Sequence, residues 1–171
     1  QNYDTRIYKF SLKNGKASYV AAGEVDGNIL NQFSMDEYKG FFRVTTTSMV
    51  PGKDFTTSTG NNVYILDSSM KTVGKLENLA RGERIYSTRF IGDKAYMVTF
   101  RNTDPLFVLD VKDPYSPKVL GELKIPGFSN YLHPYDENNI IGIGKDAEVS
   151  YQYGTEMAFH QGIKLAIFDV S

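Results

Sequence analysis

Cysteine and tryptophan are absent from this sequence, and only two of its 171 residues are histidine. Without cysteine, the chain can form no disulfide bond, no thiolate zinc site and no cysteine nucleophile. This absence leaves the compartment open, because a secreted protein need not contain disulfide bonds. Two histidines are too few for a multi-histidine metal site, and we expect neither a metal ion nor another cofactor.

The sequence also lacks an excess of charge of either sign. Lysine and arginine together number 19 and aspartate and glutamate number 20, which gives a formal net charge of −1. This balance argues against nucleic-acid binding, which needs a strongly basic surface, and against a polybasic membrane-binding patch. No apolar run approaches the ~18 residues of a transmembrane helix, so we expect no membrane span. The hydrophobic fraction of 41% is nevertheless enough for a folded core.

Four segments of the sequence share one apolar pattern. They span residues 7–12, 63–68, 106–111 and 165–170, and they are rich in β-branched and aromatic residues. This composition is typical of mostly buried β-strands, and we expect alternate residues of the last three segments to be buried between neighbouring sheets. These residues are Tyr64, Leu66, Leu106, Val108, Leu165 and Ile167.

Each segment belongs to a recurring set of short strand patterns. The most compact set consists of residues 85–90, 95–100, 106–111 and 117–123, with the turn signal Gly92-Asp93 between its first two members. A second complete set consists of residues 30–34, 41–45, 63–68 and 71–76. Two partial sets occur as well, one at 128–132, 140–143 and 165–170 and one at 7–12 and 16–20. Four short strands per repeat of about 40–50 residues are typical of a β-propeller blade.

The expected fold is therefore all-β: a partial β-propeller with four-stranded antiparallel blades, two of them complete and flanked by incomplete ones. With strands lettered a to d from the axis outward, residues 1–27 supply strands c and d, and residues 128–171 supply strands a to c. Residues 29–80 and 85–126 form the complete blades. Because the chain starts and stops within a blade, we expect a fragment of a longer propeller. A β-sandwich also has short strands, but it does not explain the recurring set of four.

Several stretches of the second half resemble a known family. They span residues 81–86, 98–108, 117–127, 131–138 and 141–146. Together they are similar to secreted prokaryotic proteins that have a C-terminal β-propeller domain distantly related to WD-type repeats. The resemblance covers essentially residues 5–171 and is strongest from 80 to 146. It implies a propeller fold and an extracytoplasmic location, and it supplies no catalytic residues.

Two insertions lie between the second and third strands of their repeats, at residues 46–62 and 145–162. In a propeller such loops emerge on one face, and loops on a rigid scaffold often carry binding function, although neutral drift of loop length gives the same pattern. The hydroxyl-rich segment 45–60 suits a flexible or sugar-contacting loop, or a solvated linker. The second insertion alternates around Gly154 like a protruding hairpin.

The candidate binding residues lie in and near these insertions. On the second hairpin, exposed aromatic side chains would mark an interface, whereas rings folded onto the blades would only pack. Charged residues of both signs follow two of the b strands, where they could bind a polar ligand or form salt bridges within the rim. The candidates are Arg101, Asp104, Lys145, Asp146, Tyr151, Tyr153 and Phe159, and Arg81 and Glu83 lie in a neighbouring d–a loop.

His133 is the obvious candidate for catalysis, because Asp136 follows it closely and a histidine–aspartate pair can act as a general base. No serine stands in a Gly-x-Ser-x-Gly setting, however, so the sequence has no nucleophile elbow. The alternative is a turn histidine that is hydrogen-bonded to the backbone. We predict no catalytic residue and favour a non-enzymatic role.

The function favoured by the sequence is an extracytoplasmic binding scaffold for a protein or glycan, contacted through the two insertions. The alternatives are a propeller enzyme with an axial active site completed by further blades, and a structural spacer of the cell envelope. Open sheet edges and uncovered blade faces also predict self-association. Strands a to c at the end of one chain could take the d strand at the start of another, or two chains could bury their open faces in a looser dimer.

Overall fold

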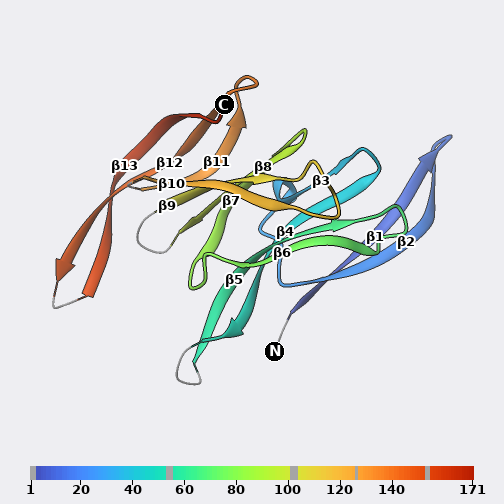
Figure 1. Ribbon diagram of the computed structural model, residues 1–171, viewed down its shortest axis with the longest axis horizontal. Coiled ribbons are helices and arrows are strands. Elements are labelled where there is room, and N and C mark those ends of the chain that lie inside the picture. The colour runs from blue at the N-terminus through green and yellow to red at the C-terminus, as the bar shows by residue number, and fades with distance from the viewer. Residues whose placement is uncertain (1–2, 53–55, 101–103, 126, 153–154) are drawn as a thin grey trace.

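The computed structural model describes residues 3–52, 56–100, 104–125, 127–152 and 155–171, with the backbone alone at residues 104, 125, 148–152 and 155–160. In this part of the chain the strands form four antiparallel β-sheets that stand side by side (Figure 1). The sheets follow the order of the sequence, from the blue β1–β2 sheet on the right to the red β11–β13 sheet on the left.

The first sheet contains β1 (Asp4–Lys13) and β2 (Lys16–Asp26). The second contains β3 (Met35–Tyr38), β4 (Phe41–Pro51), β5 (Thr57–Leu66) and β6 (Thr72–Leu79). The third contains β7 (Arg84–Ile91), β8 (Lys94–Phe100), β9 (Asp104–Asp110) and β10 (Lys118–Ile125). The fourth contains β11 (Phe128–Pro134), β12 (Asn139–Gln152) and β13 (Thr155–Asp169).

Within each sheet every strand pairs with its neighbour in the sequence. The prediction of an all-β fold with four-stranded antiparallel sheets is therefore confirmed. The described residues contain one short 3₁₀ turn, η1 (Gln32–Ser34), and no helix among them is long and apolar enough to cross a membrane.

The first strands of neighbouring sheets lie together at the centre. Strand β7 lies against both β11 and η1. The Ser87 hydroxyl donates a hydrogen bond to the carbonyl oxygen of Ser129 at 2.7 Å, and Arg89 Nε donates to that of Leu132 at 2.9 Å. In the two four-stranded sheets the last strand, β6 or β10, forms the edge opposite the first strand. The sheets therefore meet at their first strands, and we call this arrangement a fan.

Apolar side chains fill the space between successive sheets. Strand β5 shows the pattern best, because both of its faces are covered and its residues alternate between two cores. Tyr64 and Leu66 pack in the core toward the first sheet, whereas Val63 and Ile65 pack in the core toward the third sheet. A third core between the last two sheets includes Phe168.

The buried side chain of Arg43, in β4, also joins the second and third sheets. Arg43 is 1% exposed, and its Nε and Nη2 donate to the two carboxylate oxygens of Asp36 at 2.7 and 2.6 Å. Its Nη1 donates to the carbonyl oxygen of Gly92 in the β7–β8 turn at 2.6 Å. All three nitrogens of the guanidinium therefore have a partner, which is what makes a buried charge tolerable.

The burial predicted for the third strand of each sheet is confirmed in part. Tyr64, Leu66 and Leu106 are buried. The prediction was wrong for Leu165 and Ile167, which are 67% and 65% exposed, and Val108 is only half-buried. Among the described side chains of β13, Ala166 and Phe168 meet the core against the third sheet, whereas those of the opposite face are exposed.

The segment 30–34, expected to be a strand, folds differently. Residues 32–34 form η1, and the strand begins at Met35. The side chain of Asn31 accepts a hydrogen bond from the backbone N–H of Phe33 at 2.9 Å, and the Ser34 hydroxyl accepts from the N–H of Asn31. Such capping bonds compete with strand pairing, and they start the 3₁₀ turn here.

Both insertions are extensions of β-hairpins. Pairing of β4 with β5 runs to Pro51 and Thr57, and pairing of β12 with β13 runs to Gln152 and Thr155. The two extended hairpins project on the same side of the row of sheets (Figure 1), and we call this side the hairpin face. The prediction of a hairpin in the second insertion is confirmed.

Candidate functional site

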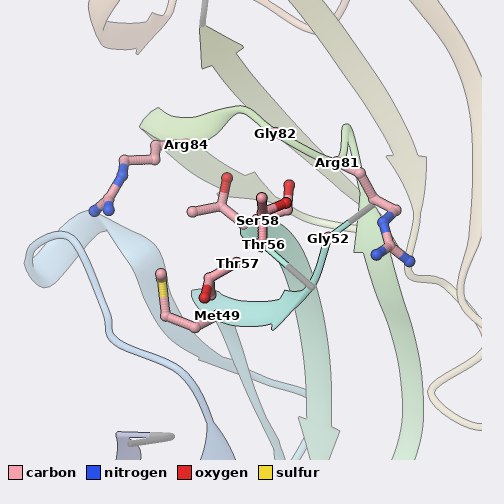
Figure 2. A pocket seen from close by; sticks show the side chains of 9 residues that line it. Met49, Gly52, Thr56, Thr57, Ser58, Arg81, Gly82 and Arg84 are labelled. Atoms are coloured by element: carbon pink, nitrogen blue, oxygen red, sulfur yellow. The ribbon is translucent and has the colours of Figure 1, made fainter. Parts of the chain in front are cut away.

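A cleft of about 920 Å³ lies on the hairpin face, between hairpin β4–β5 and the loop that joins β6 to β7. Figure 2 shows Arg81 and Arg84 on opposite sides of this cleft, with Thr56, Thr57 and Ser58 between them. The residues that line it are Met49, Gly52, Thr56, Thr57, Ser58, Thr59, Arg81, Gly82 and Arg84. We call it the arginine cleft.

A second cleft of about 690 Å³ adjoins the arginine cleft. Met49, Thr57 and Arg84 line both clefts, and we call the two neighbouring clefts together the trough. The second cleft extends to Tyr3 and Asn28 at the edge of the first sheet.

A buried amide holds the β6–β7 loop, which contains Arg81 and leads into Arg84 at the start of β7. Asn61 of β5 is 0% exposed. Its Nδ2 donates to the carbonyl oxygens of Leu79, Ala80 and Glu83 at 3.1, 3.4 and 3.3 Å, and its Oδ1 accepts from the Thr47 hydroxyl at 2.8 Å. This one side chain therefore connects β4, β5 and the β6–β7 loop.

The neighbouring amide fixes the end of β6. Asn62 is 1% exposed, and its Oδ1 accepts from the backbone N–H of Asn78 at 3.0 Å. Its Nδ2 donates to the hydroxyls of Thr46 and Ser48 at 3.2 and 3.0 Å. Because side chains alternate along a strand, Asn61 and Asn62 lie on opposite faces of β5, and of the two Asn61 alone contacts the loop.

The hydroxyl-rich segment is thus neither a flexible loop nor a solvated linker over most of its length. Thr45, Thr46 and Ser48 are buried, and the Thr45 hydroxyl lies 3.0 Å from that of Thr88 on the next sheet. Threonine is β-branched and favours strands, and here its hydroxyls bond to one another and to the two amides.

The second half of the loop is tied to β5 and β8. Thr59 donates its hydroxyl to the carbonyl oxygen of Glu83 at 2.6 Å and accepts at its own carbonyl from the N–H of Gly82 at 2.9 Å. The carboxylate of Glu83 accepts from the Thr99 hydroxyl at 2.5 Å. The side chain of Glu83 is therefore already engaged away from the cleft.

The same contacts hold the loop in an uncommon backbone conformation. Asn78, Ala80 and Gly82 all have positive φ, at 61°, 44° and 87°. Such a φ is unfavourable for alanine, and it persists where surrounding contacts determine the backbone. The positions of Arg81 and Arg84 are therefore set in advance of any ligand.

The two arginines give the trough its charge. Arg81 donates from Nη2 to the carbonyl oxygen of Pro51, which pins its side chain to the β4–β5 hairpin. Arg84 is exposed, and neither arginine forms an ion pair with another described residue. Within the described part of the chain, no aspartate or glutamate lines either cleft. The trough is a basic, hydroxyl-lined surface on a chain whose net charge is −1.

A family model described as "Beta propeller domain" matches residues 1–171, that is, the whole chain. The chain belongs to the β-propeller domain family. The fan of antiparallel sheets is consistent with this family, and the sheets can be described as propeller blades from here on.

Two relatives of this propeller domain come from archaea. An uncharacterized protein of Methanocaldococcus jannaschii is 58% identical over 127 residues, which cover 74% of this chain and 20% of that protein. An uncharacterized protein of Archaeoglobus fulgidus is 43% identical over 167 residues, which cover 98% of this chain and 23% of that protein. The chain thus spans about a fifth of the length of the curated relatives that it matches.

The candidate residues from the sequence do not converge on the arginine cleft of the propeller. Lys145 and Asp146 are exposed on β12, next to a bulge in its pairing with β13, and they line neither cleft. Among the remaining candidates, Arg101 and Tyr153 lie outside the described residues. For Asp104, Tyr151 and Phe159 the structure describes the backbone alone. Their proposed role in an interface stays a prediction.

His133 does not form a general-base pair with Asp136 in the propeller. Its Nδ1 lies 3.2 Å from the hydroxyl of Tyr131, so its partner is a side chain rather than the expected backbone group. The carboxylate of Asp136 instead accepts hydrogen bonds from the N–H of Asn138 and the side chain of Asn139, which lower the pKa of Asp136.

Sequence reasoning missed the residues that build the cleft. Sequence patterns single out Arg81 only as part of a rim of mixed charge, and they do not single out Arg84 or Asn61. One signal was available: the threonines before the Pro51-Gly52 turn and those after it form two runs of similar length, as the arms of a hairpin do. The contact between Asn61 and the loop near residue 80 carries no such signal, because it depends on tertiary structure.

Proposed function

We propose that this propeller domain is a non-enzymatic binding scaffold located outside the cytoplasm, which holds a protein or glycan ligand on its hairpin face. The observation that carries the proposal is the arginine cleft, whose loop is fixed by the buried Asn61 before any ligand arrives. A preformed site binds with a smaller loss of conformational entropy than a site that must be ordered. The extended β12–β13 hairpin on the same face provides a second surface for the same ligand.

Hydrogen bonding at the centre of the fan favours a scaffold over an enzyme with an axial site. The Ser87 hydroxyl donates to the backbone of β11, and the Thr88 hydroxyl pairs with that of Thr45. These groups hold neighbouring blades together, and their engagement is that of structural residues. The binding proposal needs only what the hairpin face already offers, namely a rigid trough with accessible polar groups.

Binding by the full-length protein tests this proposal. A glycan array and cross-linked capture from cell-envelope extracts would be compared for the wild type, a cleft-filling Thr57→Trp variant and a Ser18→Trp control on the exposed β1–β2 hairpin. We expect Thr57→Trp to lose the ligand at an unchanged melting temperature and Ser18→Trp to keep it. Equal binding by all three proteins, or chemical turnover of the ligand, would contradict the proposal.

The proposed location needs its own measurement. Protease added to intact cells should degrade the propeller domain while a cytoplasmic marker survives. Degradation only after lysis would place the domain inside the cell and would remove the extracytoplasmic part of the proposal.

A further inference from the structure

We propose that the trough formed by the two clefts binds a linear polysaccharide that carries carboxylate groups, such as a polymer rich in uronic acid. This inference rests on the proposed binding function and specifies the ligand class of the same site.

The charge of the trough selects an anionic ligand. Arg81 and Arg84 line it, and no acidic residue lines its described part. Glu83 lies between them in the sequence, and its carboxylate accepts from the Thr99 hydroxyl. Neither guanidinium forms an ion pair with a described residue, so within this part of the chain both can pair with an anionic ligand.

The placement of the two arginines favours a ligand that carries several anionic groups along its length. Arg81 and Arg84 stand on opposite sides of the arginine cleft (Figure 2), and Arg84 also borders the second cleft. A guanidinium pairs well with a planar carboxylate, because two parallel N–H donors match its two oxygens. A linear chain with one carboxylate on each of several successive units can meet both arginines at once.

The remaining lining selects a saccharide rather than an acidic peptide. Thr57 and Ser58 lie between the arginines, and hydroxyl groups can donate to and accept from sugar hydroxyls. Met49 and the 61%-exposed Tyr3 offer apolar surfaces for the C–H faces of sugar rings. A peptide interface would centre on apolar or aromatic anchors, and hydroxyls occupy that place here.

The loop geometry makes the site selective. Asn61 fixes the backbone on both sides of Arg81, and the bond from Arg81 to the Pro51 carbonyl holds its side chain against the hairpin. Donors held in place by the fold lose little freedom on binding and reject ligands that lack the matching acceptor. A neutral polymer of the same shape should therefore bind markedly less well.

Titration of the full-length protein with three polymers tests the inference. The probes are polygalacturonate, the same polymer with its carboxylates methyl-esterified, and polyglutamate. We expect polygalacturonate to bind in a salt-sensitive manner. The methyl ester should bind at least about tenfold more weakly, since it loses charge-assisted hydrogen bonds that contribute a factor of this order. Polyglutamate keeps the carboxylates but lacks sugar hydroxyls, and it should also bind more weakly than polygalacturonate.

Variants assign the binding to the trough. Arg84→Ala should weaken polygalacturonate binding about tenfold or more, and Arg84→Lys should restore only part of it, because lysine keeps the charge but lacks the paired donors. Arg6→Ala, at an exposed arginine of β1 that pairs with Glu24, is the matched control and should bind like the wild type. Melting temperatures should be the same for all four proteins.

The outcomes separate this inference from the proposed function. Equal binding of polygalacturonate and its methyl ester would overturn the carboxylate inference and leave a glycan-binding scaffold. Equal or tighter binding of polyglutamate would overturn the choice of a saccharide. If no polymer binds but Thr57→Trp still abolishes capture of a protein partner, the inference is wrong and the proposed function stands. If neither polymer nor partner depends on Thr57, both are wrong.

Discussion

Strands β5 and β13 are the third strands of their blades and carry the same kind of apolar sequence, yet their surroundings differ completely. Leu66 of β5 is 0% exposed, whereas Leu165 of β13 is 67% exposed. Blades cover β5 on both faces, but within the described chain only one face of β13 meets another blade. The apolar pattern thus states which side chains can be buried, and the presence of a neighbouring blade decides whether they are.

Glycines on the outer strands show the same contrast. Gly74 of β6 pairs with Ile65, and Gly121 of β10 pairs with Val108, so they occupy matching places in successive blades. A Cβ atom added at Gly74 would collide with the carbonyl oxygen of Pro114 in the β9–β10 turn of the next blade. A Cβ atom added at Gly121 would meet nothing within 4 Å. Glycine is therefore required at position 74, where a turn of the next blade comes close, and not at position 121.

Leucine truncation should give the largest difference between the covered and uncovered surfaces. Leu66→Ala leaves a cavity in a closed core and is expected to lower the free energy of unfolding by about 2–5 kcal/mol. Leu165→Ala removes an exposed side chain and should change it by no more than about 0.5 kcal/mol. Urea denaturation of this chain measures both, at a concentration low enough for light scattering to show a monomer, because association would cover Leu165. Similar losses in the two variants would show that β13 is covered in solution.

Filling the two glycine positions should give a smaller difference of the same sign. Gly74→Ala forces the Pro114 turn to move, and overpacking of this kind costs about 1–3 kcal/mol. Gly121→Ala meets open space and should be neutral within about 0.5 kcal/mol. The midpoints of thermal unfolding should follow the same order. If Gly121→Ala proved the more harmful change, the comparison between the blades would fail.

High pH should distinguish a covered tyrosine from an uncovered one. Burial, with help from the charge of Glu77, raises the pKa of Tyr64. The pKa of the Tyr64 phenol is therefore higher in the folded chain than in the unfolded chain, where it is about 10. The protonated phenol makes its full contribution to stability below the unfolded pKa, and this contribution is lost as pH rises through the folded pKa.

We therefore expect Tyr64→Phe to reduce the loss of stability between about pH 10 and pH 11, which urea denaturation at each pH would measure. At neutral pH this variant loses the bond to Glu77 and should be less stable by about 1 kcal/mol. Tyr8→Phe is the control, because Tyr8 is 56% exposed, and its profile should follow the wild type. Parallel alkaline profiles for all three proteins would refute the role of burial.

The uncovered face should affect association more than stability. Exposed Ile163, Leu165 and Ile167 form an apolar row on β13, and such rows promote association. We predict that this chain self-associates at micromolar concentration and that Leu165→Lys with Ile167→Lys makes it monomeric, with a change in unfolding free energy within about 0.5 kcal/mol. Light scattering would decide, and a monomeric wild type of 19.3 kDa would contradict the prediction.

The pattern of apolar and β-branched residues along the sequence was sufficient to predict most strands and their assignment to blades. Residues 63–68 and 106–111 are rich in apolar and β-branched residues, and they lie at the third strands of the two central blades. Pattern failed where a side chain competes with backbone pairing, as Asn31 does at the start of η1. It also failed for Leu165, since the sequence of a strand contains no information about whether another blade stands beside it.

The candidate site was less predictable than the fold. The sequence predicted that both insertions lie on one face and that the second forms a hairpin, because insertion length and alternation are local properties. The arginine cleft depends on Asn61 reaching Ala80 and Glu83. An asparagine within a strand is generally an unfavourable choice, and only the folded structure shows what this one supports.

The residue-by-residue pairing of hairpin β4–β5 restricts how evolution can alter it. A single residue inserted between Asn61 and the body of the blade would turn Asn61 and Asn62 to opposite faces and disconnect the loop. Residues added beyond Met49 and Thr59, toward the tip, would leave both amides in register. Length and composition can therefore diverge at the tip while Asn61 and Asn62 keep their hydrogen bonds and the β6–β7 loop keeps its position.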